Sequence, residues 1–176
     1  DRLSKINVGN TVEYVEDLVG SPKVSRAIDP ETTANYFYTD DYLLTLFYND
    51  ERVVAYTWVS LDEGFQPEVV LSSGEMGEIG EFVFADMPLE AKGYSLDDSH
   101  IVSYYLENLE GGQAAGLVDT YLGNVQYGAY GADEGIAGLY QAEVNGDKAS
   151  VAGAYKRLRD ETLPNLYGRG NLSLRD

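Results

Sequence analysis

The sequence has 176 residues, 44% of them hydrophobic, and its 30 acidic and 12 basic side chains give a formal net charge of −18. This length and apolar content suit one or two small domains with a buried core and exclude an acidic disordered tail. The negative charge excludes nucleic acid and anionic lipid surfaces as partners, because both need cationic contacts. The sequence contains no cysteine, so disulfides, zinc ribbons and thiol catalysis are excluded too.

A short helix is the first predicted element, at residues 12–19. Thr11 supplies a capping side chain before it, and Gly20 and Pro22 end it. One apolar stripe at helical spacing is formed by Val12, Val15, Leu18 and Val19. The rest of the helix is acidic, which opposes a bound phosphate or a membrane surface. The helix is therefore predicted to pack against a sheet.

An antiparallel meander is predicted after this helix. Three runs rich in aromatic and β-favouring residues are its strands, at residues 34–38, 42–48 and 53–61. A four-residue loop at residues 49–52 joins the last two, which must then be antiparallel neighbours. The lone Trp58 shares a predicted face with Val54 and Tyr56. Core packing is its predicted role, and an exposed aromatic contact is the alternative.

Residues 5–61 resemble the SmpA/OmlA family, the BamE-like small lipoproteins of the bacterial outer membrane. The resemblance rests on four features: Ile6-x-x-Gly9 before the helix, the stop Leu18-Val19-Gly20-Ser21-Pro22, the aromatic "YFY", and the hairpin "LLTLFYNDERVVAYTWV". It implies a helix-plus-meander fold, a bacterial source and an extracytoplasmic, periplasmic location.

A linker-like stretch at residues 62–68 divides the chain into two predicted domains, 1–66 and 67–176. The pattern leaves open whether the two share one core. Short strands are predicted at 69–71 and 81–84, with an acidic loop of Gly-Glu triplets between them. Its glutamates, Glu75, Glu78 and Glu81, do not converge in an extended chain, so no metal site is predicted.

The only histidine, His100, lies close to Asp97 and Asp98. An acid–histidine pair occurs in metal sites and in general bases. However, the sequence contains neither Gly-x-Ser-x-Gly nor His-Glu-x-x-His, and no glycine loop of a nucleotide site. His100 is therefore predicted to lie in an exposed loop before a strand or short helix at 101–106, where the composition favours a strand. No catalytic residue or cofactor is predicted.

A glycine-rich region follows, in which Tyr121, Tyr127 and Tyr130 are interleaved with the glycines. These tyrosines form either a contact surface for a sugar or protein partner or a set of ordinary Gly-Tyr packing contacts. Both interpretations stay open at the level of sequence.

A second helix is predicted at residues 148–162, with an irregular tail after it. Its apolar stripe consists of Val151, Ala152, Tyr155 and Leu158, and Pro164 stops it. Lys156, Arg157 and Arg159 form the one basic cluster of this acidic chain. They dock either on the chain's own acidic body or on a partner.

The predicted fold class is α+β: a helix packed on an antiparallel meander, then a Gly/Tyr-rich mixed region with a C-terminal helix. The second half, with "LPNLYG" at residues 163–168, is similar to uncharacterised bacterial membrane-anchored proteins, which implies an anchor upstream of Asp1. The predicted function is a non-enzymatic, extracytoplasmic protein-binding domain. A small-molecule or carbohydrate-binding module and a carboxylate-based hydrolase are the alternatives.

Overall fold

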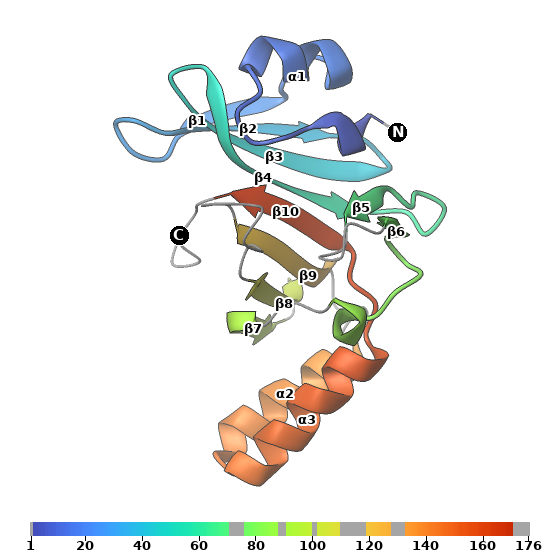
Figure 1. The fold of residues 1–176 in the computed structure, drawn as a ribbon. Coiled ribbons are helices and arrows are strands. Elements are labelled where there is room, and N and C mark those ends of the chain that lie inside the picture. The colour runs from blue at the N-terminus through green and yellow to red at the C-terminus, as the bar shows by residue number, and fades with distance from the viewer. Residues whose placement is uncertain are drawn as a thin grey trace.

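The computed structural model describes residues 2–70, 76–87, 91–99, 102–109, 119–127 and 133–170. Within these ranges the fold is α+β, and its main feature is an eight-stranded antiparallel sheet (Figure 1). The strand order is β1-β2-β3-β4-β10-β9-β8-β7, so the strand nearest the C-terminus lies in the middle of the sheet.

The first part of the chain contains η1 (Leu3–Lys5), α1 (Val12–Val19), β1 (Val24–Ala27), β2 (Thr33–Tyr38), β3 (Tyr42–Asn49) and β4 (Arg52–Ser60). A small separate hairpin follows, formed by β5 (Glu68–Val70) and β6 (Met76–Glu78). The remaining elements are η2 (Phe84–Asp86), β7 (Ala91–Asp98), β8 (Val102–Leu109), β9 (Asp119–Tyr127), α2 (Glu134–Asn145), α3 (Lys148–Glu161) and β10 (Leu166–Gly170).

The local signals of the first helix are confirmed. The Thr11 hydroxyl accepts a hydrogen bond of 3.1 Å from the backbone N–H of Tyr14. Gly20 ends the helix with φ of +88°, a conformation that side chains disfavour. Val15 is completely buried in the core. The helix therefore packs by its apolar stripe, as predicted.

The meander of β2, β3 and β4 is confirmed, but its tightest turn differs from the prediction. Asn49 pairs directly with Arg52, so only Asp50 and Glu51 form the turn. Both have positive φ, 49° and 60°, which is the backbone of a type I′ turn. The prediction of a four-residue loop was wrong. Type I′ turns usually carry Gly or Asn, and this turn contains neither, so the sequence carries no signal for it.

A β-bulge interrupts the alternation of inward and outward side chains that was predicted for β4. The register shifts between Phe47 and Tyr48, so the extra residue of β4 is Val54. As a result Val53, not Val54, joins the core, at 1% exposed. Trp58 is 2% exposed, and its core role is confirmed.

The tail predicted to be irregular forms β10, and this prediction was wrong. β10 pairs with β4 on one side and with β9 on the other. The ring of Tyr167 lies 5.7 Å from that of Trp58, between centroids. A Cβ atom at Gly168 would lie 2.3 Å from the carbonyl oxygen of Tyr56. Glycine is therefore required for the close approach of these two strands. The fold does not end in a helix, because β10 follows α3.

Two further predictions in the second half differ from the structure. The strand expected at 81–84 is absent from the described residues there, and a 3-10 turn, η2, begins at Phe84 instead. Helix α2 was not predicted, because Gly135 and Gly138 placed it within the glycine-rich region. The strand expected at 101–106 is confirmed as β8, and the helix expected at 148–162 is confirmed as α3.

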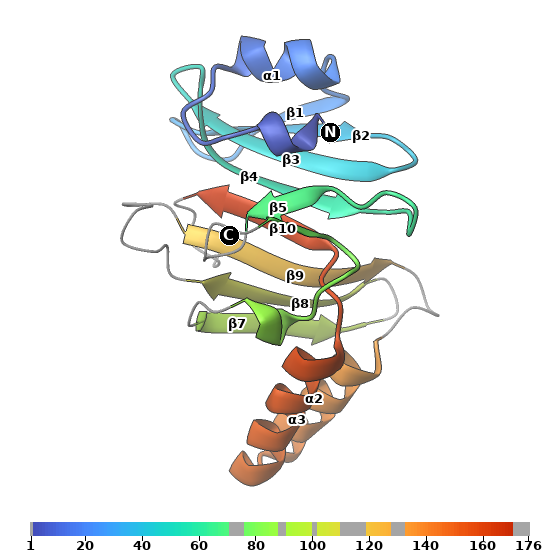
Figure 2. The ribbon, with the colours of Figure 1, turned by 45° about the vertical axis from the view of Figure 1, so that its right-hand side comes forward.

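One hydrophobic core runs along one face of the sheet and contains residues from both predicted domains. Figures 1 and 2 show α1 beside the β1 edge and the hairpin of α2 and α3 beyond the β7 edge. The helices and the 3-10 turn η2 contribute these buried residues to the core: Val15 from α1, Phe84 from η2, Ile136 and Leu139 from α2, and Leu158 from α3. A smaller cluster on the opposite face contains Val59, Tyr121 and Leu166.

Two glycine substitutions, one in the closely packed β10 and one on α3, are predicted to have opposite effects on stability. Gly168→Ala is expected to destabilise the fold by about 1–3 kcal/mol, because its Cβ has no room beside β4. Gly153 lies in α3, and no atom is within 4 Å of the Cβ that an alanine would add there. Gly153→Ala is therefore expected to stabilise the fold by up to about 1 kcal/mol. Urea unfolding followed by circular dichroism measures both. Equal effects would contradict the central packing of β10.

Candidate functional site

A cleft of about 750 Å3 lies at one end of the sheet, where β4 and β9 finish and β10 begins. We call it the end cleft. Its described walls come from the connection after β4, the turn after β6, the end of β9, the start of α2 and the connection from α3 to β10. Its lining residues are Ser60, Leu61, Asp62, Glu63, Phe65, Gln66, Ile79, Gly80, Asn124, Gln126, Asp133, Glu161, Leu163, Pro164 and Asn165.

Several polar groups of the end cleft are engaged in holding its walls together. The side-chain amide of Asn124 donates to the carbonyl oxygen of Leu163 at 2.8 Å. Asn165 accepts from the N–H of Val125 and donates to its carbonyl, both at 2.8 Å. The Ser60 hydroxyl donates to a backbone carbonyl of the adjoining loop at 2.6 Å. These bonds fix the shape of the cleft before any ligand binds.

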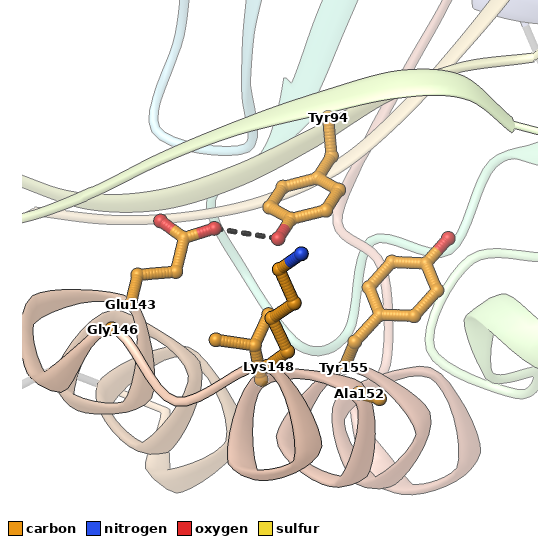
Figure 3. Close-up of a pocket in the computed structure, with 7 residues that line it drawn as sticks. Tyr94, Glu143, Gly146, Lys148, Ala152 and Tyr155 are labelled. Atoms are coloured by element: carbon orange, nitrogen blue, oxygen red, sulfur yellow. Dashed lines mark hydrogen bonds between the residues drawn. The ribbon is translucent and has the colours of Figure 1, made fainter.

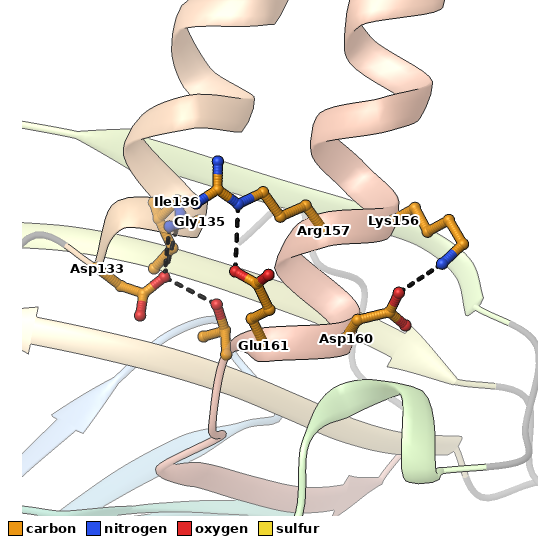
Figure 4. Close-up of polar contacts among 8 residues, drawn as sticks. Asp133, Gly135, Ile136, Lys156, Arg157, Asp160 and Glu161 are labelled. Carbon is orange, nitrogen blue, oxygen red and sulfur yellow. Dashed lines mark hydrogen bonds and ion pairs between the residues drawn. The ribbon is translucent and has the colours of Figure 1, made fainter.

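Four carboxylates line the end cleft: Asp62, Glu63, Asp133 and Glu161. Asp133 caps α2, since its Oδ1 accepts from the N–H groups of Gly135 and Ile136 (Figure 4). The same oxygen accepts from the Thr162 hydroxyl at 2.8 Å, which ties the start of α2 to the end of α3. No Lys or Arg is among the described residues that line this cleft.

Two exposed leucines flank the end cleft. Leu61 is 44% exposed and Leu163 is 45% exposed. They come from different connections, one after β4 and the other before β10. Large exposed apolar side chains beside a cleft are typical of contact sites.

A second, shallower groove lies between β7 and the helical hairpin, with a volume of about 530 Å3. Tyr94 of β7 stacks on Tyr155 of α3, with ring centroids 5.2 Å apart. Its hydroxyl donates to Glu143 of α2 at 2.5 Å, and Figure 3 shows Lys148 reaching towards the same hydroxyl. Burial and the bond to Glu143 raise the pKa of Tyr94 to about 12.

A buried polar network lies behind this groove. Arg159 of α3 donates to Glu107 of β8 at 2.7 Å, and the Glu107 side chain is completely buried. Tyr105 also donates to Glu107, at 2.5 Å, and Arg159 donates to the carbonyl of Phe84 at 3.1 Å. Burial alone would lower the pKa of Arg159, but its bonds and attraction to Glu107 outweigh burial, so this pKa is raised. Burial and the charge of Glu107 raise the pKa of Tyr105.

The structure separates the three bases that the sequence grouped together. Arg159 docks on the chain's own Glu107. Lys156 and Arg157 instead make exposed i,i+4 pairs with Asp160 and Glu161, visible in Figure 4. A signal for this separation exists in the sequence: Arg159 follows Tyr155 by four residues and so continues the buried stripe of the helix.

The three tyrosines also have different environments. Tyr121 is 2% exposed, so it lies too deep to contact a partner directly. Tyr127 is 56% exposed and follows Gln126 of the end cleft along β9. Tyr130 lies outside the described residues, as does His100. Sequence reasoning missed the end cleft altogether, because its described lining comes from five separated segments.

The part of the chain that the structure describes shows neither a metal-binding cluster nor a membrane-spanning helix. There, no group of three or more His, Asp or Glu side chains has the arrangement of a metal site. None of the helices there has the length and apolar character needed to cross a membrane.

Comparisons with known proteins give no family. No family model matches the chain, and no curated protein matches it. Among solved structures, a cysteine-rich secretory protein from Staphylococcus aureus matches with 11% identity and a TM-score of 0.31. The match covers 61% of this chain and 40% of that one, so it spans less than half of the secretory protein. A likeness at this level carries no argument about function.

The Glu107–Arg159 pair gives a stability prediction. Arg159→Met is expected to cost about 3–5 kcal/mol, because it leaves the buried Glu107 charge without its cation. Glu107→Met/Arg159→Met should recover part of that loss, since neither charge remains. Arg157→Met, the same change two residues away in an exposed pair, should alter stability little. Denaturant unfolding measures all three. Similar losses for Arg157→Met and Arg159→Met would refute a special role for the buried pair.

The raised pKa of Tyr94 predicts an alkaline loss of stability. Below pH 10 the hydroxyl keeps its proton in both the folded and the unfolded chain, so its contribution is complete. Above pH 10 the unfolded chain releases this proton first, and stability falls until the pH passes about 12. Unfolding curves at pH 9 to 12 should show a smaller fall for Tyr94→Phe. Glu143→Gln should give an intermediate slope, whereas an unchanged slope in both variants would contradict this assignment.

Proposed function

We propose that this chain is a non-enzymatic protein-binding domain of a membrane-anchored bacterial protein, located outside the cytoplasm. The observation that carries the proposal is the end cleft with its two exposed leucines, Leu61 and Leu163. Apolar side chains at such exposure gain free energy when a partner removes them from water.

The polar groups of the end cleft support a binding role over catalysis. Asn124, Asn165 and Ser60 are occupied by bonds to the backbone, and Oδ1 of Asp133 caps α2. Among the described residues that line the cleft, no nucleophile lies against a histidine base. Such an arrangement supplies a rigid surface with fixed charges, which suits recognition.

Two exposed tyrosines extend the proposed contact area. Tyr38 ends β2 and is 49% exposed, and Tyr127 ends β9 and is 56% exposed. The register places both strand ends at the same end of the sheet as the end cleft. Tyrosine is enriched among the residues that dominate binding energy at protein interfaces.

The bacterial source, the location and the anchor rest on sequence resemblance. Residues 5–61 resemble the BamE-like SmpA/OmlA unit, in which a helix packs on a meander. In this chain α1 and the meander of β2, β3 and β4 have that order. The membrane association would come through a segment upstream of Asp1.

Site-specific photocrosslinking in the native host tests the proposal. A photoreactive residue placed at Leu61, Leu163 or Tyr127 of the full-length protein is expected to give one discrete protein adduct. The matched controls are Tyr14 and Val144, which are 41% and 64% exposed but lie on α1 and α2. Mass spectrometry identifies the adduct. Equal yields at test and control positions, or no adduct at any test position, would refute protein binding at this end of the sheet.

A further inference from the structure

We infer that the end cleft binds an extended, basic segment of the partner that carries both Lys or Arg and large aliphatic side chains. This inference rests on the proposed protein-binding function and names the chemistry of its partner. It follows from three independent features of the end cleft: its charge, its exposed leucines and its amide groups.

The charge of the end cleft selects a cationic ligand. Among the described residues, its lining contains Asp62, Glu63, Asp133 and Glu161 and no cationic side chain. One of these carboxylates, Glu161, pairs with Arg157 at the surface, where both side chains are 65% exposed. An exposed pair of this kind is weak and exchanges readily for another cation. The net charge of −18 also steers basic ligands towards the chain from a distance.

Two of these carboxylates are oriented before a ligand arrives. Oδ1 of Asp62 accepts from the N–H of Gly64 at 2.7 Å, and Oδ1 of Asp133 accepts from Gly135 at 2.8 Å. The described residues donate no hydrogen bond to Oδ2 of either side chain. These oxygens are fixed in position by the bonds to their partners, so a Lys or Arg that reaches them loses little entropy in ordering the site.

A ligand that is only a cation would leave the two exposed leucines in water. Leu61 and Leu163 lie on two connections that both line the cleft, and the partly buried Phe65 lines it as well. A metal ion or a polyamine leaves this apolar surface in water. A peptide segment with aliphatic side chains covers it, while the exposed side-chain amide of Gln66 is available to its backbone.

The same charge excludes a second copy of this chain as the occupant. Two chains of −18 repel each other, and Lys156, Arg157 and Arg159 of α3 are already paired within their own chain. The occupant is therefore a different protein with a basic, partly aliphatic segment.

Titration of the ¹⁵N-labelled protein with short peptides tests this inference by NMR. The probe is a blocked nine-residue peptide of three Lys-Leu-Ser repeats. Its controls are three Glu-Leu-Ser repeats, three Lys-Ser-Ser repeats and spermine. The side-chain amide signals of Gln66, Asn124, Gln126 and Asn165 report directly on the end cleft. We expect the Lys-Leu-Ser peptide to shift them, the Lys-Ser-Ser peptide to bind about tenfold more weakly, and the Glu-Leu-Ser peptide to leave them unchanged.

Matched variants separate the end cleft from the general acidity of the chain. Asp62→Asn/Glu63→Gln removes two charges from the cleft and is expected to weaken binding about fivefold. Glu13→Gln/Asp17→Asn removes two charges from α1 and should leave the affinity unchanged. Leu61→Ser/Leu163→Ser should abolish the advantage of the Lys-Leu-Ser peptide over the Lys-Ser-Ser peptide.

Three outcomes would overturn the inference: shifts spread over the whole surface, equal weakening by both charge variants, or spermine binding as tightly as the Lys-Leu-Ser peptide. The last would identify a site for cations alone. The two proposals fail differently. A crosslinked partner at Leu61 or Leu163 with no peptide binding would refute the basic segment and keep the protein-binding function. Peptide binding with no crosslinked partner would refute that function and keep the chemistry of the cleft.

Discussion

The sheet depends on the position of β10 between β4 and β9. These five residues connect two antiparallel meanders that would otherwise be separate sheets, each with an additional open edge. The glycines of this strand allow the backbones to approach, while Tyr167 packs on Trp58 across the join. The core can then run along the whole sheet, and the end cleft forms where β10 enters it.

The parts of this fold that the sequence predicted are those coded by neighbouring residues. Thr11, Gly20 and the apolar stripe between them define α1 with no information from elsewhere in the chain. Strand β10 could not be found in this way. "LYGRG" contains two glycines in five residues, which disfavours a strand on local grounds. Its strand conformation comes from β4 and β9, which pair with it from about 40 to 110 positions earlier in the sequence.

The candidate site shows the same limit. The composition shows that the chain is acidic, but it does not show which four of the thirty carboxylates line one cleft. Leu61 and Leu163 are about 100 residues apart, and only the pairing of β4 with β10 brings their connections to one end of the sheet. The different environments of the three bases could be predicted in part, because the helical period places Arg159 and Arg157 on different faces of α3. The partner of Arg159, Glu107, was also visible as an inward position between Tyr105 and Leu109 in an alternating strand.

The buried pair of Glu107 and Arg159 also limits how this protein changes over generations. Replacing either residue alone leaves one charge stranded in the core, so selection removes most single substitutions at these positions. An apolar pair of the same volume is tolerable in principle, but reaching it requires both codons to change nearly together. Relatives of this chain should therefore keep both residues or replace both, so that the two positions co-vary although 52 residues separate them.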